Sequence, residues 1–422
     1  MNWPIVTLEQ ITTRIRNGLS IRQSSAATGL PITRIETISD STINPNKVGY
    51  ADLAEGDAAD YFLEPGDILL SHINSESHIG KCAIYEGQPD PLVHGMNLLC
   101  IRANLTVVDP RFLLHLLRSP KFRSQLPAIT KRAVNQASIS IGNLRTVRCV
   151  LPTLQEQRRV IKLLELADTL RRERKEADGF AALILPTLFQ KIFGEIERNP
   201  RGWPVGPLKQ LGKPCSGGAF PLNKQGLKEG AVPFIKVSDM NLPGNERFIR
   251  SANHYVSRET LAELGVRTAP AGTIVFPKIG AAIATNKKRL LTRDTAFDNN
   301  VQGVTPLKPE STFYLYAFFE RFDLMRLARV TTLPSIRPTE LAELPVQSPP
   351  LELQAEFGRI YEQTCGTFDQ QAQSRTSIET LFQTMLHRAF TGELTAGWRE
   401  AHMKELLAEM EIQSKILKGN LR

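Results

Sequence analysis

The sequence predicts an α+β protein in which two mixed α/β domains are separated by two long helices, arranged as an internal repeat with pseudo-two-fold symmetry. Three observations predict this architecture. At 422 residues the chain is too long for one ordinary core. The segment LPTLQEQ at 151–157 returns in altered form as PPLELQ at 349–354. In both halves, short apolar runs bounded by Gly, Pro and Asp alternate with amphipathic segments.

The repeat holds at one fixed offset of 197 residues from position 138 to position 193. It aligns Ser138-Ile139 with Ser335-Ile336 and Phe193 with Phe390. Before residue 138 the offset drifts, as expected for loop insertions in two domains that share one plan. The chain therefore reads as domain, helix, domain, helix.

This order gives five segments with different expected structures. We expect a first domain at 1–150, a helical segment at 151–200, a second domain at 201–347, a second helical segment at 348–396 and a charged helix at 397–422. Within the domains, GDILLS at 66–71 and GTIVFP at 272–277 predict strands, while PRFLLHLLRSPKFRSQL at 110–126 and STFYLYAFFERFDLMRLAR at 311–329 predict amphipathic helices.

Apolar or small residues in the two helical segments recur three and four apart, which is the spacing of a coiled-coil seam. Heptads this short also occur in ordinary amphipathic helices that pack on their own domain. Duplication favours two equivalent helices packing on each other about a pseudo-two-fold axis. Pro186 is expected to kink or end the first helix. The predicted seam residues are Val160, Leu163, Ala167, Leu170, Ala177, Phe357, Ile360, Ile378 and Leu381.

The net charge of +9 is unevenly distributed, since residues 201–345 carry 20 basic and 12 acidic side chains. No acidic residue occurs at 110–155 or at 324–339, and both stretches contain a polar loop. One such stretch alone fits a solvated helix face equally well. Its recurrence favours a shared nucleic-acid-binding face, because Arg and Lys neutralise phosphates and Asn, Gln and Arg suit base edges. The predicted DNA contacts are Lys131, Arg132, Asn135, Gln136 and Ser138, and Lys278, Asn286, Lys287, Lys288, Arg289, Arg329, Ser335 and Arg337.

Motifs for catalysis are missing from the sequence. It has no P-loop, nucleophile elbow, HExxH pair or kinase set. The seven histidines are scattered, and the five cysteines lie far apart without zinc-ligand spacing. We therefore expect no catalytic residue, metal or cofactor in this chain. Two alternatives stay open: a nuclease with dispersed carboxylates, and a coiled-coil adaptor that never touches nucleic acid.

The N-terminus lacks the apolar core of a signal peptide. The longest apolar run is also far short of the roughly 20 residues that a membrane-spanning helix needs. We therefore expect a cytoplasmic protein.

Three stretches together carry a resemblance to a known family. The helix start formed by Leu151, Pro152, Leu154, Glu156 and Gln157, the phrase SGGAFPLNKQGLKEGAVPFIKVSDM at 216–240, and AFTGEL at 389–394 resemble the specificity subunit of type I restriction-modification systems. The resemblance covers nearly the whole chain and includes the domain order. The second helix start departs from the pattern, because Leu353 stands where the first has Glu156.

The resemblance implies that both domains are target recognition domains, each reading one half of a split, asymmetric DNA site. The repeated helices would form an antiparallel coiled coil that acts as a ruler for the spacer. The implied partners are double-stranded DNA, two copies of a methyltransferase subunit and restriction subunits. S-adenosylmethionine, ATP and Mg would be used by those partner subunits, and this chain would catalyse nothing. The recognition subunit of a modification-only or other methyltransferase-linked defence system is the alternative.

Overall fold

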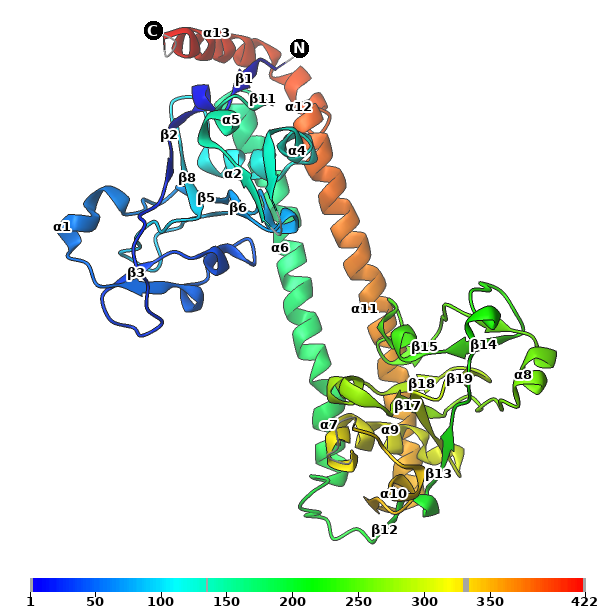
Figure 1. Ribbon diagram of the computed structural model, residues 1–422. Helices are drawn as coiled ribbons and strands as arrows, with labels where there is room; N and C mark the ends of the chain where they lie inside the picture. The colour runs from blue at the N-terminus through cyan, green and yellow to red at the C-terminus, as the bar shows by residue number, and fades with distance from the viewer. Residues whose placement is uncertain (1–2, 134–135, 329–333, 420–422) are drawn as a thin grey trace. The chain divides into compact units, whose positions relative to one another are not determined.

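The computed structural model describes residues 3–133, 136–328 and 334–419, which form two compact units. Unit 1 comprises Met1–Lys175 and Ser374–Arg422, and unit 2 comprises Glu176–Gln373. Each unit combines one predicted domain with parts of both predicted helical segments (Figure 1). Every helix in the described part of the chain is too short or too polar to traverse a lipid bilayer.

The main sheet of unit 1 is antiparallel, with the strand order β2-β8-β5-β7. Side chains along its apolar strands point alternately into two cores. On β5, Ile68 and Leu70 join one buried cluster and Leu69 joins another. A sheet buried on both faces explains why these strands appear as continuous apolar runs. The strands are β2 (Thr12–Asn17), β8 (Leu98–Ala103), β5 (Ile68–Ser71) and β7 (Cys82–Ile84).

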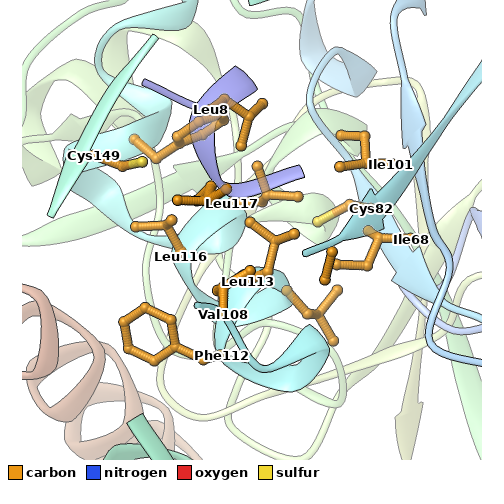
Figure 2. Close-up of a cluster of buried hydrophobic side chains, with 14 of the residues drawn as sticks. Leu8, Ile68, Cys82, Ile101, Val108, Phe112, Leu113, Leu116, Leu117 and Cys149 are labelled. Atoms are coloured by element: carbon orange, nitrogen blue, oxygen red, sulfur yellow. The ribbon is translucent and has the colours of Figure 1, made fainter. Parts of the chain in front are cut away.

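Helix α2 (Pro110–Arg118) covers one face of this sheet. It begins sharply because Asp109 accepts a hydrogen bond from the Arg111 N–H at 2.9 Å and Pro110 occupies the first helical position. Its Leu113 and Leu117 lie in the cluster with strand residues Ile68 and Ile101 (Figure 2). The predicted amphipathic helix therefore supplies the apolar cover of the sheet.

Smaller elements complete unit 1. Strand β10 lies between β6 and β9, β1 pairs with β11, and β3 pairs with β4. Short helices α3 and α4 follow α2, and α5 precedes β11. Their bounds are β1 (Ile5–Thr7), β3 (Leu30–Ile32), β4 (Gly49–Ala51), β6 (Ile73–Asn74), β9 (Thr130–Ala133), β10 (Gln136–Ile139), β11 (Arg148–Val150), α3 (Pro120–Arg123), α4 (Leu126–Ile129) and α5 (Ile141–Arg145).

Unit 2 repeats this plan, as the sequence predicts. Its sheet β13-β20-β17-β18 matches β2-β8-β5-β7 and gains β15 at one edge, while β14 lies between β16 and β19. Helix α9 takes the place of α2, α10 that of α5, and the pair β12·β21 that of β1·β11. The elements are β12 (Val205–Pro207), β13 (Gly212–Ser216), β14 (Val232–Ile235), β15 (Phe248–Ile249), β16 (Tyr255–Val256), β17 (Ile274–Pro277), β18 (Arg289–Leu291), β19 (Ala296–Phe297), β20 (Val301–Pro306), β21 (Pro345–Gln347), α9 (Thr312–Arg321) and α10 (Pro338–Ala342).

The long helices are α6 (Leu154–Ala182) with α7 (Ile184–Phe193), and α11 (Leu351–Thr391). The break between α6 and α7 falls at Leu183, and Pro186 lies in the first turn of α7, where a missing N–H costs little. The C-terminal segment forms α12 (Ala396–Ala401) and α13 (Met403–Gly419).

Within each unit, the two helical segments pack against each other. In unit 1 they are antiparallel. Arg171, in the second half of α6, pairs with Glu379 of α11 at 2.8 Å, whereas Glu156 at the start of α6 accepts a hydrogen bond from Thr395 beyond the end of α11. In unit 2 the Phe193 ring lies 5.2 Å from that of Phe357.

The buried seam differs from the predicted one. Leu170 and Leu381 are 43% and 48% exposed, and Ala177 is exposed too. On α6 the buried Val160, Leu164 and Ala167 lie four and three residues apart, so the heptad spacing is kept but the seam passes through Leu164 instead of Leu163. On α11 the buried Phe357, Tyr361 and Cys365 advance by four. Val160, Ala167 and Phe357 are buried as predicted, Leu163, Ile360 and Ile378 are half-buried, and Tyr361, Cys365, Phe382 and Leu386 are buried though unpredicted.

The repeated helix start has the same local role in both units. The side-chain amide of Gln157 donates to the Pro152 carbonyl at 2.9 Å, and that of Gln354 donates to the Pro349 carbonyl at 2.8 Å. Both glutamines are buried. The shared Pro and Gln therefore fix the angle at which the chain enters each long helix.

Candidate nucleic-acid interface

The predicted DNA contacts of the first domain gather on the β9–β10 hairpin. Lys131 pairs across the hairpin with Ser138. Because side chains alternate along a strand, Lys131, Gln136 and Ser138 share one face, while Ala137 and Ile139 on the other face are buried in the core. Lys131 and Gln136 are exposed and Ser138 is half-buried.

Arg132 lies on the same hairpin but opposite Ala137. Its guanidinium pairs with the Glu76 carboxylate at 2.7 Å, and both side chains are about two-thirds exposed. Such an exposed pair contributes little to stability, so Arg132 can exchange its partner for a phosphate at small cost. Asn135 lies outside the described residues.

An equivalent junction occurs in unit 2. Ser335 forms a bridge with Ile279, and the Ile336 N–H donates to the Lys278 carbonyl at 3.0 Å. The same two contacts join β10 to the β6 region in unit 1. The alignment of Ser138-Ile139 with Ser335-Ile336 is therefore confirmed in three dimensions.

The exposure of the predicted residues in this part of unit 2 varies. Arg337 is exposed, whereas Lys278 and Ser335 are half-buried. Arg329 lies outside the described residues.

Three further residues of unit 2 that the sequence predicts to contact DNA make hydrogen bonds within the fold. They are Asn286, Lys288 and Arg289. Lys288 is only 4% exposed, and its ammonium donates to the Phe322 carbonyl at 2.7 Å. Burial lowers the pKa of Lys288 to about 8. A DNA phosphate cannot reach this buried ammonium, so the prediction for Lys288 is corrected: the residue immediately before β18 points inward.

The neighbours of Lys288 also make side-chain hydrogen bonds within the protein. Arg289 donates to the backbone carbonyls of Lys288 and Met240. Asn286 has a positive φ of 52° and its side-chain oxygen accepts from the Leu324 N–H. Lys287 is half-buried, as are Asn286 and Arg289, and its ammonium donates to the Asn241 side-chain oxygen.

Groups that could act in catalysis have the properties of core residues. Burial lowers the pKa of His94 and of His115 to about 4, so both imidazoles are neutral at pH 7. Burial raises the pKa of the Cys100 and Cys149 thiols to about 12, which keeps them protonated. Among the described residues, no group of His, Cys, Asp and Glu is placed to hold a metal ion.

Comparison with known proteins relates the sequence to one family. The family model for the type I restriction modification DNA specificity domain matches residues 200–380. A putative type I restriction enzyme MjaX specificity subunit from Methanocaldococcus jannaschii is 40% identical over 250 residues, covering 56% of this chain and 59% of the relative. The type I restriction enzyme EcoKI specificity subunit from Escherichia coli is 28% identical over 199 residues, covering 45% and 42%. The chain thus spans about half the length of these curated relatives.

The fold extends the similarity over both units. A crystal structure of a type-I restriction-modification system S subunit from M. genitalium matches with a TM-score of 0.56 at 13% identity, covering 92% of this chain and 96% of that one. At this identity the match concerns the fold alone. It confirms the predicted architecture of two mixed domains and two long helices.

Proposed function

Because the chain is similar to specificity subunits of type I restriction-modification systems, we propose that it belongs to this family, recognises DNA and reads a bipartite, asymmetric site. Each of its two recognition domains reads one half-site. The domains share a plan but differ in surface residues, and this difference supports an asymmetric target.

The observation that carries the proposal is the exposed face of the β9–β10 hairpin. It presents the Lys131 ammonium beside the Gln136 amide on a strand pair anchored by buried Ala137 and Ile139. Lys131 neutralises a phosphate and so positions the domain, while an amide can donate and accept at one base edge. A two-stranded ribbon of this kind fits the major groove.

Unit 2 supports the proposal with a related but different surface. The segment around Ser335 makes the same junction with the main sheet, and exposed Arg337 follows it. Arginine can bond two acceptors of guanine, whereas glutamine suits adenine. The two domains therefore favour different bases.

We further propose that two methyltransferase subunits, and through them restriction subunits, dock on this protein. The repeated start of α6 and α11 supports two copies of one partner, because it offers similar backbone geometry twice. S-adenosylmethionine, ATP and Mg act in the partner subunits, and this chain contributes recognition without catalysis.

The experiment that tests the proposal is modified-base sequencing of host DNA with the gene present, deleted and restored. We expect N6-methyladenine at one split, asymmetric motif, lost on deletion and regained on restoration. Methylation that is unchanged by deletion would contradict the proposal. Restoration with Gln136→Ala should relax the preference at one base of one half-site, whereas the exposed control Gln370→Ala on α11 should leave the motif unchanged.

A further inference from the structure

A cavity of about 880 Å³ opens within unit 1. Its walls come from the last part of α6 that belongs to this unit, from residues 375–386 of α11, and from the first domain around Ser41, Cys82 and Arg118. The volume lies within the range of sites that hold small ligands. None of its lining residues belongs to the β9–β10 hairpin.

The charges around this cavity are strongly unbalanced. Seven basic side chains line it, against the three carboxylates of Asp40, Asp168 and Glu379. Two of these carboxylates are already engaged by one arginine, since Arg171 lies 2.9 Å from Asp168 and 2.8 Å from Glu379. Arg118, Arg123 and Lys175 make no ion pair with these three carboxylates, so an anionic ligand can balance their charge.

Two arginines in the wall are held by neutral groups. Arg118 Nη2 donates to the carbonyls of Ser41 at 2.5 Å and Cys82 at 3.0 Å, and its Nε is buried with no hydrogen-bond partner among the described residues. Arg123 Nη2 donates to the Gly80 carbonyl at 3.5 Å. Carbonyl oxygens fix the position of a guanidinium but leave its charge uncompensated, so these groups are preorganised for an anion.

The floor of the cavity is apolar. Phe382 is 5% exposed, and the Arg171 guanidinium lies over its ring at 4.1 Å from the centroid. Ile378 and Leu386 lie beside it in the lining. Forked guanidinium donors around a low-dielectric floor favour phosphate, whose several oxygens accept paired hydrogen bonds.

We propose that this cavity is a phosphate-binding site for a multiply charged phosphate ligand, either a free polyphosphate or successive phosphates of a DNA strand. The site requires no base edge and lies apart from the hairpin proposed to read sequence. Binding of a free polyphosphate would go beyond the proposed function, whereas binding of a DNA strand would rest on it and deepen it.

The test removes two exposed charges at the rim. Arg172, whose side chain is 72% exposed, and Lys175, which is also exposed, are changed in Arg172→Gln/Lys175→Gln. The matched control is Lys415→Gln/Lys418→Gln on α13, which loses the same charge outside the cavity. Each double variant also loses one exposed pair four residues apart, Arg172 with Asp168 or Lys415 with Glu411.

The probes are sodium triphosphate, measured by calorimetry, and a 30-base-pair duplex of arbitrary sequence, measured by fluorescence anisotropy at several salt concentrations. Equal thermal melting curves establish that both variants fold. Triphosphate binding that is roughly tenfold weaker in the cavity variant, but unchanged in the control, supports a free polyphosphate. If only the duplex binds, a salt slope smaller by about two in the cavity variant alone supports a DNA strand. The proposal is overturned if the wild type binds neither probe, or if the two variants behave alike with both.

Discussion

At the scale of single residues, Glu156 shows how one side chain of the repeated motif acquires a second role. It is 1% exposed and accepts hydrogen bonds from Trp3 at 2.8 Å, Thr395 at 2.6 Å and Arg399 at 2.7 Å. It thereby ties Trp3 and the segment from Thr395 to Arg399 to the start of α6. At the equivalent position of unit 2 stands Leu353, which is half-buried.

Removal of the Glu156 carboxylate should therefore lower the free energy of unfolding far more than removal of an exposed carboxylate in the first turn of a helix. Glu156→Ala leaves the Arg399 guanidinium buried without its partner, which should lower the free energy of unfolding by about 3–5 kcal/mol. Glu352→Ala, at an exposed position in the first turn of α11, should cost less than about 1 kcal/mol. Urea unfolding followed by tryptophan fluorescence measures both. Equal effects would show that the buried pair adds nothing beyond the helix dipole.

Lys288 gives a prediction of pH dependence. Its pKa falls from 10.5 to about 8 because burial penalises the charged form. Between these values the unfolded chain binds more protons than the folded one, so stability should rise as pH increases from about 8 to 10.5. Lys288→Met retains the apolar stem and removes the titrating group, so this rise should be absent from the variant. Urea titrations of both proteins at pH 8 and pH 10 provide the comparison. Parallel pH dependence would contradict the burial argument.

At the scale of elements, the sequence predicted secondary structure well where one physical constraint dominates. Strand β5 was predictable because both faces of its sheet are buried, and the break before Pro186 because proline lacks an N–H. The seam was less predictable because Leu163 and Leu164 are adjacent and both apolar. Periodicity alone cannot tell which of two neighbouring leucines faces the partner helix.

The corrected seam can be tested directly. Leu164→Ala removes a side chain with no exposed surface and should destabilise unit 1 by about 2–5 kcal/mol. Leu170→Ala removes a side chain that is 43% exposed and should cost less than about 1 kcal/mol. The two substitutions change helix propensity equally, so the difference in urea midpoint reports burial. A larger effect at Leu170 would instead support the seam that the sequence predicts, through Leu163 and Leu170.

At the scale of the whole molecule, duplication was the most informative property of the sequence. The fixed offset of 197 correctly paired α6 with α11 and α5 with α10, because these elements follow each other without insertions. Strand order was not predictable. Neighbours such as β2 and β8 come from segments more than 80 residues apart, and nothing local in the sequence records their pairing.

The antiparallel pair β12·β21 defines the boundaries of a domain that can be exchanged as a unit. Val205 lies opposite Gln347, so the chain enters and leaves the second domain at neighbouring points. Exchange of residues 201–347 for the corresponding segment of a similar specificity subunit therefore replaces a closed domain and leaves the helices covalently intact. We expect sequencing of methylated DNA to show one half-site changed and the other half-site retained. The reciprocal exchange of residues 1–150, which closes through β1·β11, should change only the other half. Alteration of both half-sites by a single exchange would mean that the two domains do not read DNA independently.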